Sequence, residues 1–418
     1  MAQTNQNKWV VLAILTLVYT FSFIDRQLLV ILAEPVKADL GLSDTQLGLL
    51  TGLAFAALYV TLGLPVARLA DKGNRKNVVS ASLAIWSLMT VISGMATNFV
   101  QMLFARIGVG IGEAGGSPPS HSIISDYFEP QKRATALSIY SVGIYIGIFV
   151  GFTIGGVLAQ HYGWRVAFYA VGIPGVLLAV LIYFFVKEPP KGRFDPPQLS
   201  SENLTLSNVV RTLMGKKTFV FIALGSGFIA FGSYGAGNFL PSFLQRVHGV
   251  DISKAGYLLG ISFGIGGGLG TFLGGYLADK MRRSDMRWYI WLPMVSALLA
   301  LIPFGIYLFS DSLNVVVWMI FMVSALLGAY LGPAIAVTHS LVSARMRAFS
   351  SAVLFLILNI IGLGLGPLTI GFLSDLFQPE YGDLSLRWAF CGIFLSQTLA
   401  ILFFGLASRH YLKEVLSG

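Results

Sequence analysis

Long apolar segments dominate this chain and restrict what it can fold into. A helix needs roughly 20 consecutive apolar residues to cross a bilayer, and the 418-residue sequence holds twelve such segments. We place them at 9–32, 46–70, 77–97, 99–124, 132–159, 164–187, 217–245, 253–279, 288–309, 313–342, 347–375 and 387–410. Only 11% of the residues are charged, against roughly 25% in soluble domains. The sequence therefore predicts an all-α, polytopic membrane protein with twelve transmembrane helices.

One long polar stretch divides the chain into two halves. It opens with Glu188-Pro189-Pro190 and lies between the sixth and seventh apolar segments. We predict an N-terminal six-helix bundle over 1–187, a cytoplasmic central loop over 188–216 and a C-terminal six-helix bundle over 217–418.

The distribution of lysine and arginine predicts the orientation in the membrane. Cytoplasmic loops carry an excess of both residues. With the N-terminus inside, the cytoplasmic side receives twenty-one of them and the outer side receives five, Lys37, Arg165, Arg246, Lys254 and Arg387. We therefore expect both termini to be cytoplasmic. The net charge of +9 then reflects topology, and no nucleic-acid partner is expected.

The two halves repeat one another in sequence. Leu69-Ala70-Asp71-Lys72 recurs 208 residues later as Leu277-Ala278-Asp279-Lys280, and Arg133-Ala134 recurs 214 residues later as Arg347-Ala348. Duplicated halves are typical of carriers that bind their substrate near the membrane midplane, between the repeats. This architecture predicts alternating access by rocking of the two halves.

Two segments carry charged residues at membrane depth, Asp25-Arg26 in the first and Arg106 and Glu113 in the fourth. Seven residues turn a helix through about 700°, so Arg106 and Glu113 share one face, roughly 10 Å apart along the axis. A charge in the membrane costs about 2.5–3.5 kcal/mol and normally faces a bundle interior. We predict that the two helices meet and that Asp25, Arg26, Arg106 and Glu113 couple proton and substrate. The alternative is an ion-pair network that only joins helices.

Two acids beside two bases also suggest a mechanism. Protonating Glu113 or Asp25 would free an arginine to hold an anionic substrate group. The second half has Ile320 and Leu327 at the positions equivalent to Arg106 and Glu113, so its wall of the cavity should be polar and aromatic. Candidate cavity residues there are Tyr234, Asn238, His339 and Asn359; alternatively these residues only make hydrogen bonds between helices. A cavity with one charged wall and one uncharged, aromatic wall would suit an amphiphile better than a sugar.

Charged residues in the loops form a candidate cytoplasmic gate. They are Asp71, Lys72, Arg75, Lys76, Asp126, Asp279, Arg282 and Arg283. Arg75 is expected to pair with Asp126, and Asp71 to lie at the N-terminal end of the eleventh helix, whose dipole favours an anion. These contacts would form only in the outward-facing state. The alternative is that the charges serve only as topology signals.

The segment Ala67–Lys76 resembles the loop signature of the major facilitator superfamily, G-x-L-A-D-R-x-G-R-R, and Gly275–Arg283 is a second copy. Asp25-Arg26 and Arg106-Ile-Gly-Val-Gly-Ile-Gly-Glu113-Ala114 are similar to the D-R and R-x-x-V-G-I-G-E-A motifs of the spinster group of lipid carriers. The sequence departs from eukaryotic spinster proteins at Gly115–Pro119, which suggests a bacterial-type member. The resemblance implies that Asp25 and Glu113 are proton-sensitive acids and that Arg106 is a substrate or partner charge.

We therefore expect a secondary active transporter that uses protons to move a lysolipid or sphingoid-type amphiphile across the membrane. The alternative is a carrier of small organic anions or drugs, proton-coupled or facilitative. The five histidines show no i,i+3 or i,i+4 pairing, so neither a metal site nor an enzyme is expected, and no cofactor is implied. We expect a monomer in the bacterial inner membrane, with the substrate, protons and the lipid bilayer as its partners.

Overall fold

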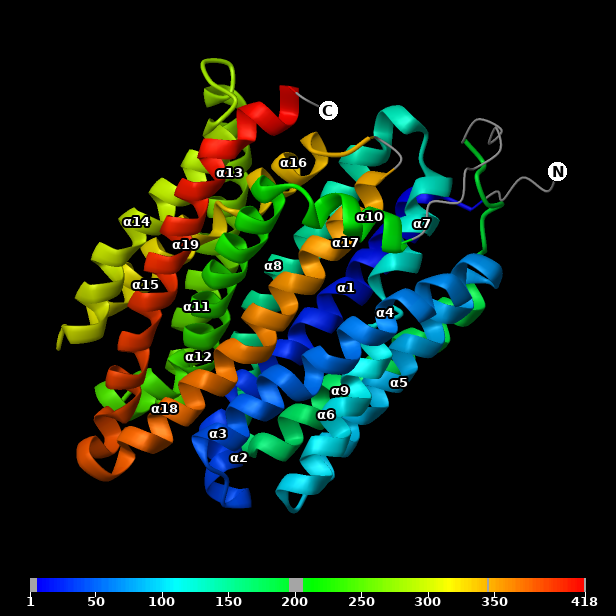
Figure 1. The fold of residues 1–418 in the computed structure, drawn as a ribbon. Coiled ribbons are helices and arrows are strands. Elements are labelled where there is room, and N and C mark those ends of the chain that lie inside the picture. The colour runs from blue at the N-terminus through cyan, green and yellow to red at the C-terminus, as the bar shows by residue number, and fades with distance from the viewer. Residues whose placement is uncertain (1–5, 195–205, 344–345, 417–418) are drawn as a thin grey trace. The chain divides into compact units, whose positions relative to one another are not determined.

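The computed structural model describes residues 6–194, 206–343 and 346–416. Within these ranges the regular structure is helical, which confirms the all-α class (Figure 1). Ten stretches of the described chain are long and apolar enough to cross a membrane. One of them, Phe349–Val415, contains two of the predicted segments, and the predicted segment 99–124 is present as two shorter helices. Together they account for the twelve predicted segments.

The chain folds into two compact units that exchange short segments. The first unit comprises Met1–Leu42, Ala54–Ser200 and Asp251–Gly260, and the second comprises Ser43–Leu53, Ser201–Val250 and Ile261–Gly418. Two of the passages between units coincide with π-helical turns, η1 (Leu49–Leu53) and η2 (Gly260–Gly266). Because π-turns often occur at functional sites, these two are candidate hinges.

In the first unit, a row of glycines brings two long helices together. The unit contains α1 (Lys8–Ile31), α2 (Ala33–Leu40), α4 (Ala54–Lys72), α5 (Arg75–Met95), α6 (Phe99–Glu113), α7 (Ser117–Tyr127), α8 (Pro130–Tyr162), α9 (Trp164–Phe185) and α12 (Ile252–Leu259). A Cβ on Gly147 of α8 would lie 2.6 Å from the carbonyl oxygen of Thr20 on α1. Glycine therefore allows α1 and α8 to run side by side (Figure 1).

Helix α6, which carries Arg106 and Glu113, is fixed by its glycines. It begins after Asn98, whose side chain accepts a hydrogen bond from the Gln101 backbone N–H. A Cβ on Gly110 would lie 2.7 Å from the Phe55 carbonyl oxygen of α4. The backbone of α6 thus packs on α4 and α5, and its charged side chains extend to α1.

Gly112→Ala should destabilise the protein by about 1–3 kcal/mol, the usual cost of overpacking. The new Cβ would lie 2.6 Å from the Trp86 backbone nitrogen of α5, so a helix backbone has to move. Thermal unfolding in detergent measures the effect. The matched control is Gly63→Ala in α4, where nothing lies within 4 Å of an added Cβ. Equal melting temperatures for the two variants would contradict this account.

Two predicted segments are each interrupted at equivalent positions. The segment 99–124 breaks at 114–116, and α7 then starts with Pro118 and Pro119 in its first turn. The segment 313–342 consists of α15 (Leu313–Gly328) and α16 (Leu331–Ser340). Each of these predicted segments therefore consists of two helices in succession. Because the two breaks lie about 215 residues apart, they are a feature of the repeat.

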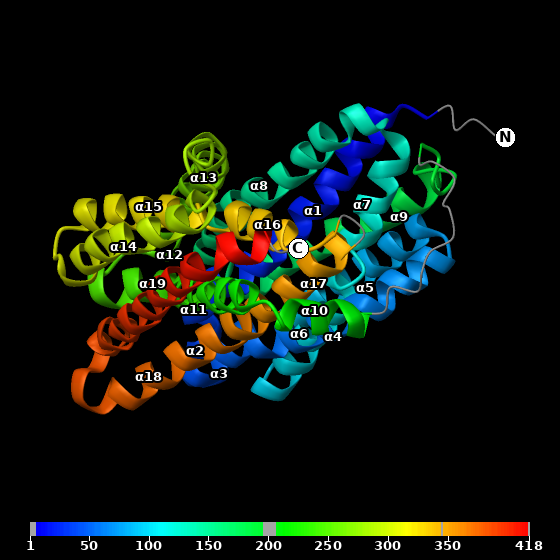
Figure 2. The same ribbon diagram turned by 45° about the horizontal axis from the view of Figure 1, so that its top comes forward.

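The second unit contains the remaining helices. They are α3 (Asp44–Gly48), α10 (Leu206–Met214), α11 (Lys217–His248), α13 (Gly267–Met281), α14 (Trp288–Phe309), α15, α16, α17 (Arg347–Leu358), η4 (Asn359–Leu365), α18 (Gly366–Tyr381), η5 (Gly382–Leu384) and α19 (Ser385–Leu416). Figure 2 shows α14 and α15 lying side by side. Helix α10 lies within the predicted central loop, and its Val209 and Leu213 are buried in the same core as Phe219. Burial of this apolar face accounts for a helix in an otherwise polar stretch.

Candidate functional site

Asp25 and Arg106 form a buried ion pair in the first unit. Nη1 of Arg106, on α6, lies 3.4 Å from Oδ2 of Asp25, on α1. The Thr90 hydroxyl of α5 donates a hydrogen bond of 2.5 Å to Oδ1 of Asp25. Both charged side chains are buried. Three helices therefore enclose this pair.

Arg26 and Glu113 form the second pair, which has the shorter contacts. Nη2 and Nε of Arg26 lie 2.6 and 2.7 Å from Oε2 of Glu113. The Ser22 hydroxyl donates to the same oxygen at 2.8 Å. The sequence analysis predicted that the two helices carrying these four charged residues meet. The structure shows how the charges pair: each residue of the Asp25-Arg26 dipeptide contacts one charged residue of α6.

Aromatic rings surround the guanidinium of Arg26. Its Cζ lies 4.9 Å from the ring centroids of Phe23 and Phe55 and 4.7 Å from that of Tyr59. Ring faces attract a cation, by about 0.5–2 kcal/mol per contact. The Arg26 side chain is also 18% exposed, whereas that of Glu113 is 1% exposed. Arg26 is therefore the more exposed charge of this pair.

Two polar atoms of the cluster make no hydrogen bond with any described residue. They are Oε1 of Glu113 and Nε of Arg106, and both are buried. An unsatisfied buried polar group costs about 1–3 kcal/mol. Since Oε2 of Glu113 accepts every hydrogen bond described for this carboxyl, a proton could bind Oε1 without displacing a donor.

The four candidate cavity residues all lie in the second unit. Nδ2 of Asn238 donates to the carbonyl oxygen of Tyr234, one turn earlier on α11, at 2.7 Å. Nε2 of His339, on α16, lies 2.6 Å from the Ser351 hydroxyl of α17, which is a hydrogen bond between helices. Asn359 begins η4 and is partly buried. That these four residues line one cavity stays a prediction.

Arg75 and Asp126, two of the candidate gate residues, form a buried ion pair. Nε of Arg75 also lies 2.6 Å from Oε1 of Glu188, just beyond α9, and Nη2 donates to the Pro189 carbonyl oxygen at 2.9 Å. All of these residues belong to the first unit. The predicted pairing of Arg75 with Asp126 is present, and the expectation that it forms only in the outward-facing state stays a prediction.

The other gate residues have separate surroundings. Lys76 donates its backbone N–H to Glu188 and its Nζ to the Tyr183 carbonyl oxygen, at 2.9 and 2.7 Å, and Lys72 is exposed. The side chain of Asp71 lies outside the described residues.

In the second loop copy, a tyrosine joins the two charges. The Tyr289 hydroxyl donates to Asp279 at 2.6 Å and accepts from Arg282 at 3.0 Å, and Arg283 is exposed.

A buried ionic cluster in the second unit was missed by the sequence analysis. Asp44, at the start of α3, is fully buried and accepts two hydrogen bonds of 2.7 Å from Arg246 of α11 and one of 2.7 Å from Ser374 of α18. Asp375 accepts from the backbone N–H groups of Asp44 and Thr45 at 2.9 and 2.7 Å. The sequence signal was an acid in the first turn of a helix, directly after the Ser43 cap, and acids are favoured in that turn on exposed helices too.

Comparison with known proteins places this site in a family. The model of the Major Facilitator Superfamily matches residues 15–367. An MFS-type efflux pump of Mycolicibacterium smegmatis is 33% identical over 98% of this chain and 94% of its own length. A probable L-galactonate transporter of Escherichia coli is 26% identical over 63% of this chain and 60% of its own length. Protein spinster homolog 3 of Danio rerio is 25% identical over 67% of this chain and 59% of its own length.

Solved structures agree with these matches. A bacterial homolog of the human lysosomal transporter spinster, in an inward-facing and unoccupied conformation, aligns with a TM-score of 0.91 and 34% identity, over 98% of this chain and 99% of that chain. The inward-facing, occupied conformation gives a TM-score of 0.87 over 97% and 98%. This chain belongs to the Major Facilitator Superfamily of membrane transporters, and it resembles the spinster group within that family.

Proposed function

We propose that this protein is a proton-coupled secondary transporter with alternating access, and that it carries an amphiphile with an anionic group, of the lysolipid or sphingoid type. The observation that carries the proposal is the Arg26–Glu113 pair, in which a buried carboxyl holds an accessible arginine and keeps one oxygen, Oε1, without a hydrogen-bond partner among the described residues.

The ionised Glu113 carboxylate and a substrate anion compete for Arg26, and a proton on Glu113 removes the carboxylate from that competition. A proton on Glu113 removes the negative charge that neutralises Arg26. The guanidinium keeps its positive charge and its ring contacts, so it can bind an anionic substrate group. Release of the proton restores the ion pair and displaces the anion. This exchange couples the flux of protons to the flux of substrate.

Asp25 is the second proton-sensitive acid, and Arg106 is its partner charge. This pair is more deeply buried than Arg26, and its single contact of 3.4 Å is longer than those of Glu113. We assign to it a supporting role. A proton on Asp25 would release Arg106, whose Nε lacks a hydrogen-bond partner in the described chain.

The amphiphilic substrate follows from the difference between the halves. Ile320 and Leu327 are buried apolar residues at the positions equivalent to Arg106 and Glu113, so the second half offers no matching charges there. Tyr234, Asn238, His339 and Asn359 would supply its polar and aromatic wall. A relative named as a sphingosine-1-phosphate transporter, from Danio rerio, supports this class; it is 27% identical over 56% of this chain.

The alternative is a carrier of small organic anions or drugs. Two relatives favour it, the efflux pump of Mycolicibacterium smegmatis and a cis,cis-muconate transport protein of Acinetobacter baylyi. In either case we propose that the bundles 1–187 and 217–418 move about η1 and η2. We also propose a monomer in the bacterial inner membrane, with both termini cytoplasmic because of the lysine and arginine bias.

Transport by proteoliposomes tests the substrate class. Vesicles containing the protein are given a labelled lysolipid with an anionic head group, a labelled phosphorylated sphingoid base or a labelled dicarboxylate, with and without an imposed pH gradient. Flux of either lipid that rises with the gradient supports the proposal. Flux of the dicarboxylate alone favours the alternative, and lipid flux that ignores the gradient contradicts proton coupling.

A further inference from the structure

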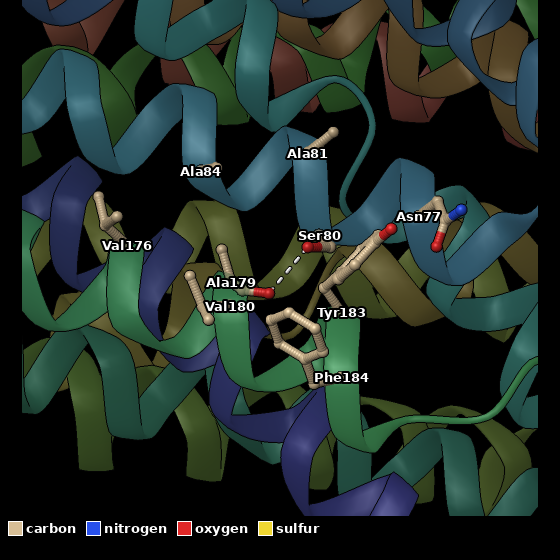
Figure 3. A pocket seen from close by; sticks show the side chains of 9 residues that line it. All are labelled: Asn77, Ser80, Ala81, Ala84, Val176, Ala179, Val180, Tyr183 and Phe184. Atoms are coloured by element: carbon tan, nitrogen blue, oxygen red, sulfur yellow. Dashed lines mark hydrogen bonds between the residues drawn. The ribbon is translucent and has the colours of Figure 1, made fainter.

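An open groove lies on the surface of the first unit, between α5 and α9. Its volume is about 410 Å³, within the ~300–1,000 Å³ range of small-molecule sites. Figure 3 shows it running from Val176 and Ala84 at one end to Asn77 and Tyr183 at the other. It is lined by Asn77, Ser80, Ala81, Ala84, Val176, Ala179, Val180, Tyr183 and Phe184.

The groove lies between two helices that remain in contact beneath it. Near their middle they pack closely: a Cβ on Gly172 of α9 would lie 2.8 Å from the Ser87 carbonyl oxygen of α5. At the level of the groove, the Ser80 hydroxyl still joins α5 to the Ala179 carbonyl oxygen at 2.8 Å (Figure 3). The small side chains of Ala81 and Ala84 leave the space above this hydrogen bond unfilled.

The groove is apolar along its length and basic at one end. Phe184 is 72% exposed at the end of α9, as expected for an aromatic residue at a membrane interface. Beside it, Nζ of Lys76 lies 5.3 Å from the ring centroid of Tyr183. Four further basic residues, all exposed, lie at the end of α4 or in the segment after α9: Lys72, Lys187, Lys191 and Arg193. The nearby acid Glu188 is engaged by Arg75 and by the Lys76 backbone.

We infer that this groove binds an anionic phospholipid of the surrounding membrane, with an acyl chain along Ala81, Ala84 and Val180 and the phosphate beside Lys76. Both α5 and α9 are membrane-spanning helices by length and composition, so a lipid chain is the occupant that the hydrocarbon supplies. Basic residues next to helix ends attract anionic head groups. This site is separate from Arg26 and Glu113, and it does not depend on which substrate the protein carries.

Native mass spectrometry of the delipidated, full-length protein tests the inference. Dioleoyl phosphatidylglycerol is titrated against dioleoyl phosphatidylcholine, which has the same chains and no net charge. We expect tighter binding of phosphatidylglycerol. Ala84→Phe, which fills the groove, should weaken that binding by about 10-fold. Lys76→Gln should reduce the preference for phosphatidylglycerol by roughly fivefold, the contribution of one basic residue.

Matched controls keep the result specific. Ala170→Phe adds the same ring to an exposed position of α9 outside the groove, and Lys132→Gln removes an exposed charge elsewhere in the first unit; neither should change binding. If Ala84→Phe does not fold, Ala81→Phe replaces it in the test. This variant fills the groove from an exposed position and should also weaken phosphatidylglycerol binding. Wild-type binding by the groove-filling variants, equal loss in Ala170→Phe, or equal affinity for the two lipids would overturn the inference.

Discussion

Glu113→Gln is expected to reduce proton-driven transport by at least about 10-fold. Glutamine keeps an oxygen that can accept hydrogen bonds from Ser22 and Arg26, but it cannot bind and release a proton near neutral pH. The charge-assisted part of the pair with Arg26, about 1.5–3 kcal/mol, is lost in every state of the cycle. That energy corresponds to roughly 10- to 100-fold. Flux into proteoliposomes against the size of the imposed pH gradient measures the loss.

Substrate binding should respond in the opposite way. In the parent protein, affinity for an anionic amphiphile should rise as the pH falls, because protonation of Glu113 frees Arg26. In Glu113→Gln, Arg26 is free at all pH values, so affinity should be high and less dependent on pH. Equilibrium binding of the labelled amphiphile in detergent, measured across a pH series, tests this point.

Glu129→Gln is the matched control, since Glu129 is an exposed residue before α8. Its flux and binding should equal those of the parent. Gradient-driven flux in Glu113→Gln at the parent rate would reduce the Arg26–Glu113 pair to a structural contact. Loss of flux together with a large fall in melting temperature would point to misfolding, and the binding measurement separates these outcomes.

Asp44→Asn is expected to destabilise the second unit by about 3–5 kcal/mol, the cost of breaking a buried ion pair by removing one partner. Arg246 would keep its charge in a site where its side chain is only 9% exposed. The attachment of α3 to α11 and α18 would weaken as a result. Thermal unfolding in detergent should show a melting temperature lower by several degrees.

Two further variants test whether the loss of stability in Asp44→Asn comes from the buried ion pair. Asp39→Asn is the control, because Asp39 pairs with Arg165 at 2.5 Å on the surface of the first unit, where such pairs contribute about 0.2–1 kcal/mol. Adding Arg246→Met to Asp44→Asn removes the unneutralised charge and should recover part of the stability. An Asp44→Asn protein as stable as Asp39→Asn would show that the buried pair contributes little.

Helix α6 shows which features of the site the local sequence predicted and which it did not. The spacing of Arg106 and Glu113 predicted that both face the same way, and the structure brings both to α1. It could not predict which acid pairs with which arginine. That choice depends on how α6 is rotated against α1, which is set by contacts such as Gly110 with α4 and Gly147 with α1.

The sequence by itself determined the all-α class, the apolar segments and the charged residues at membrane depth, because a bilayer imposes these constraints on each segment separately. Only the tertiary structure decided the ion-pair partners, the exchange of α3 and α12 between the units, and the burial of Asp44 beside Arg246. These features join residues up to 331 positions apart, and their geometry depends on how whole helices pack. No short stretch of sequence carries that information.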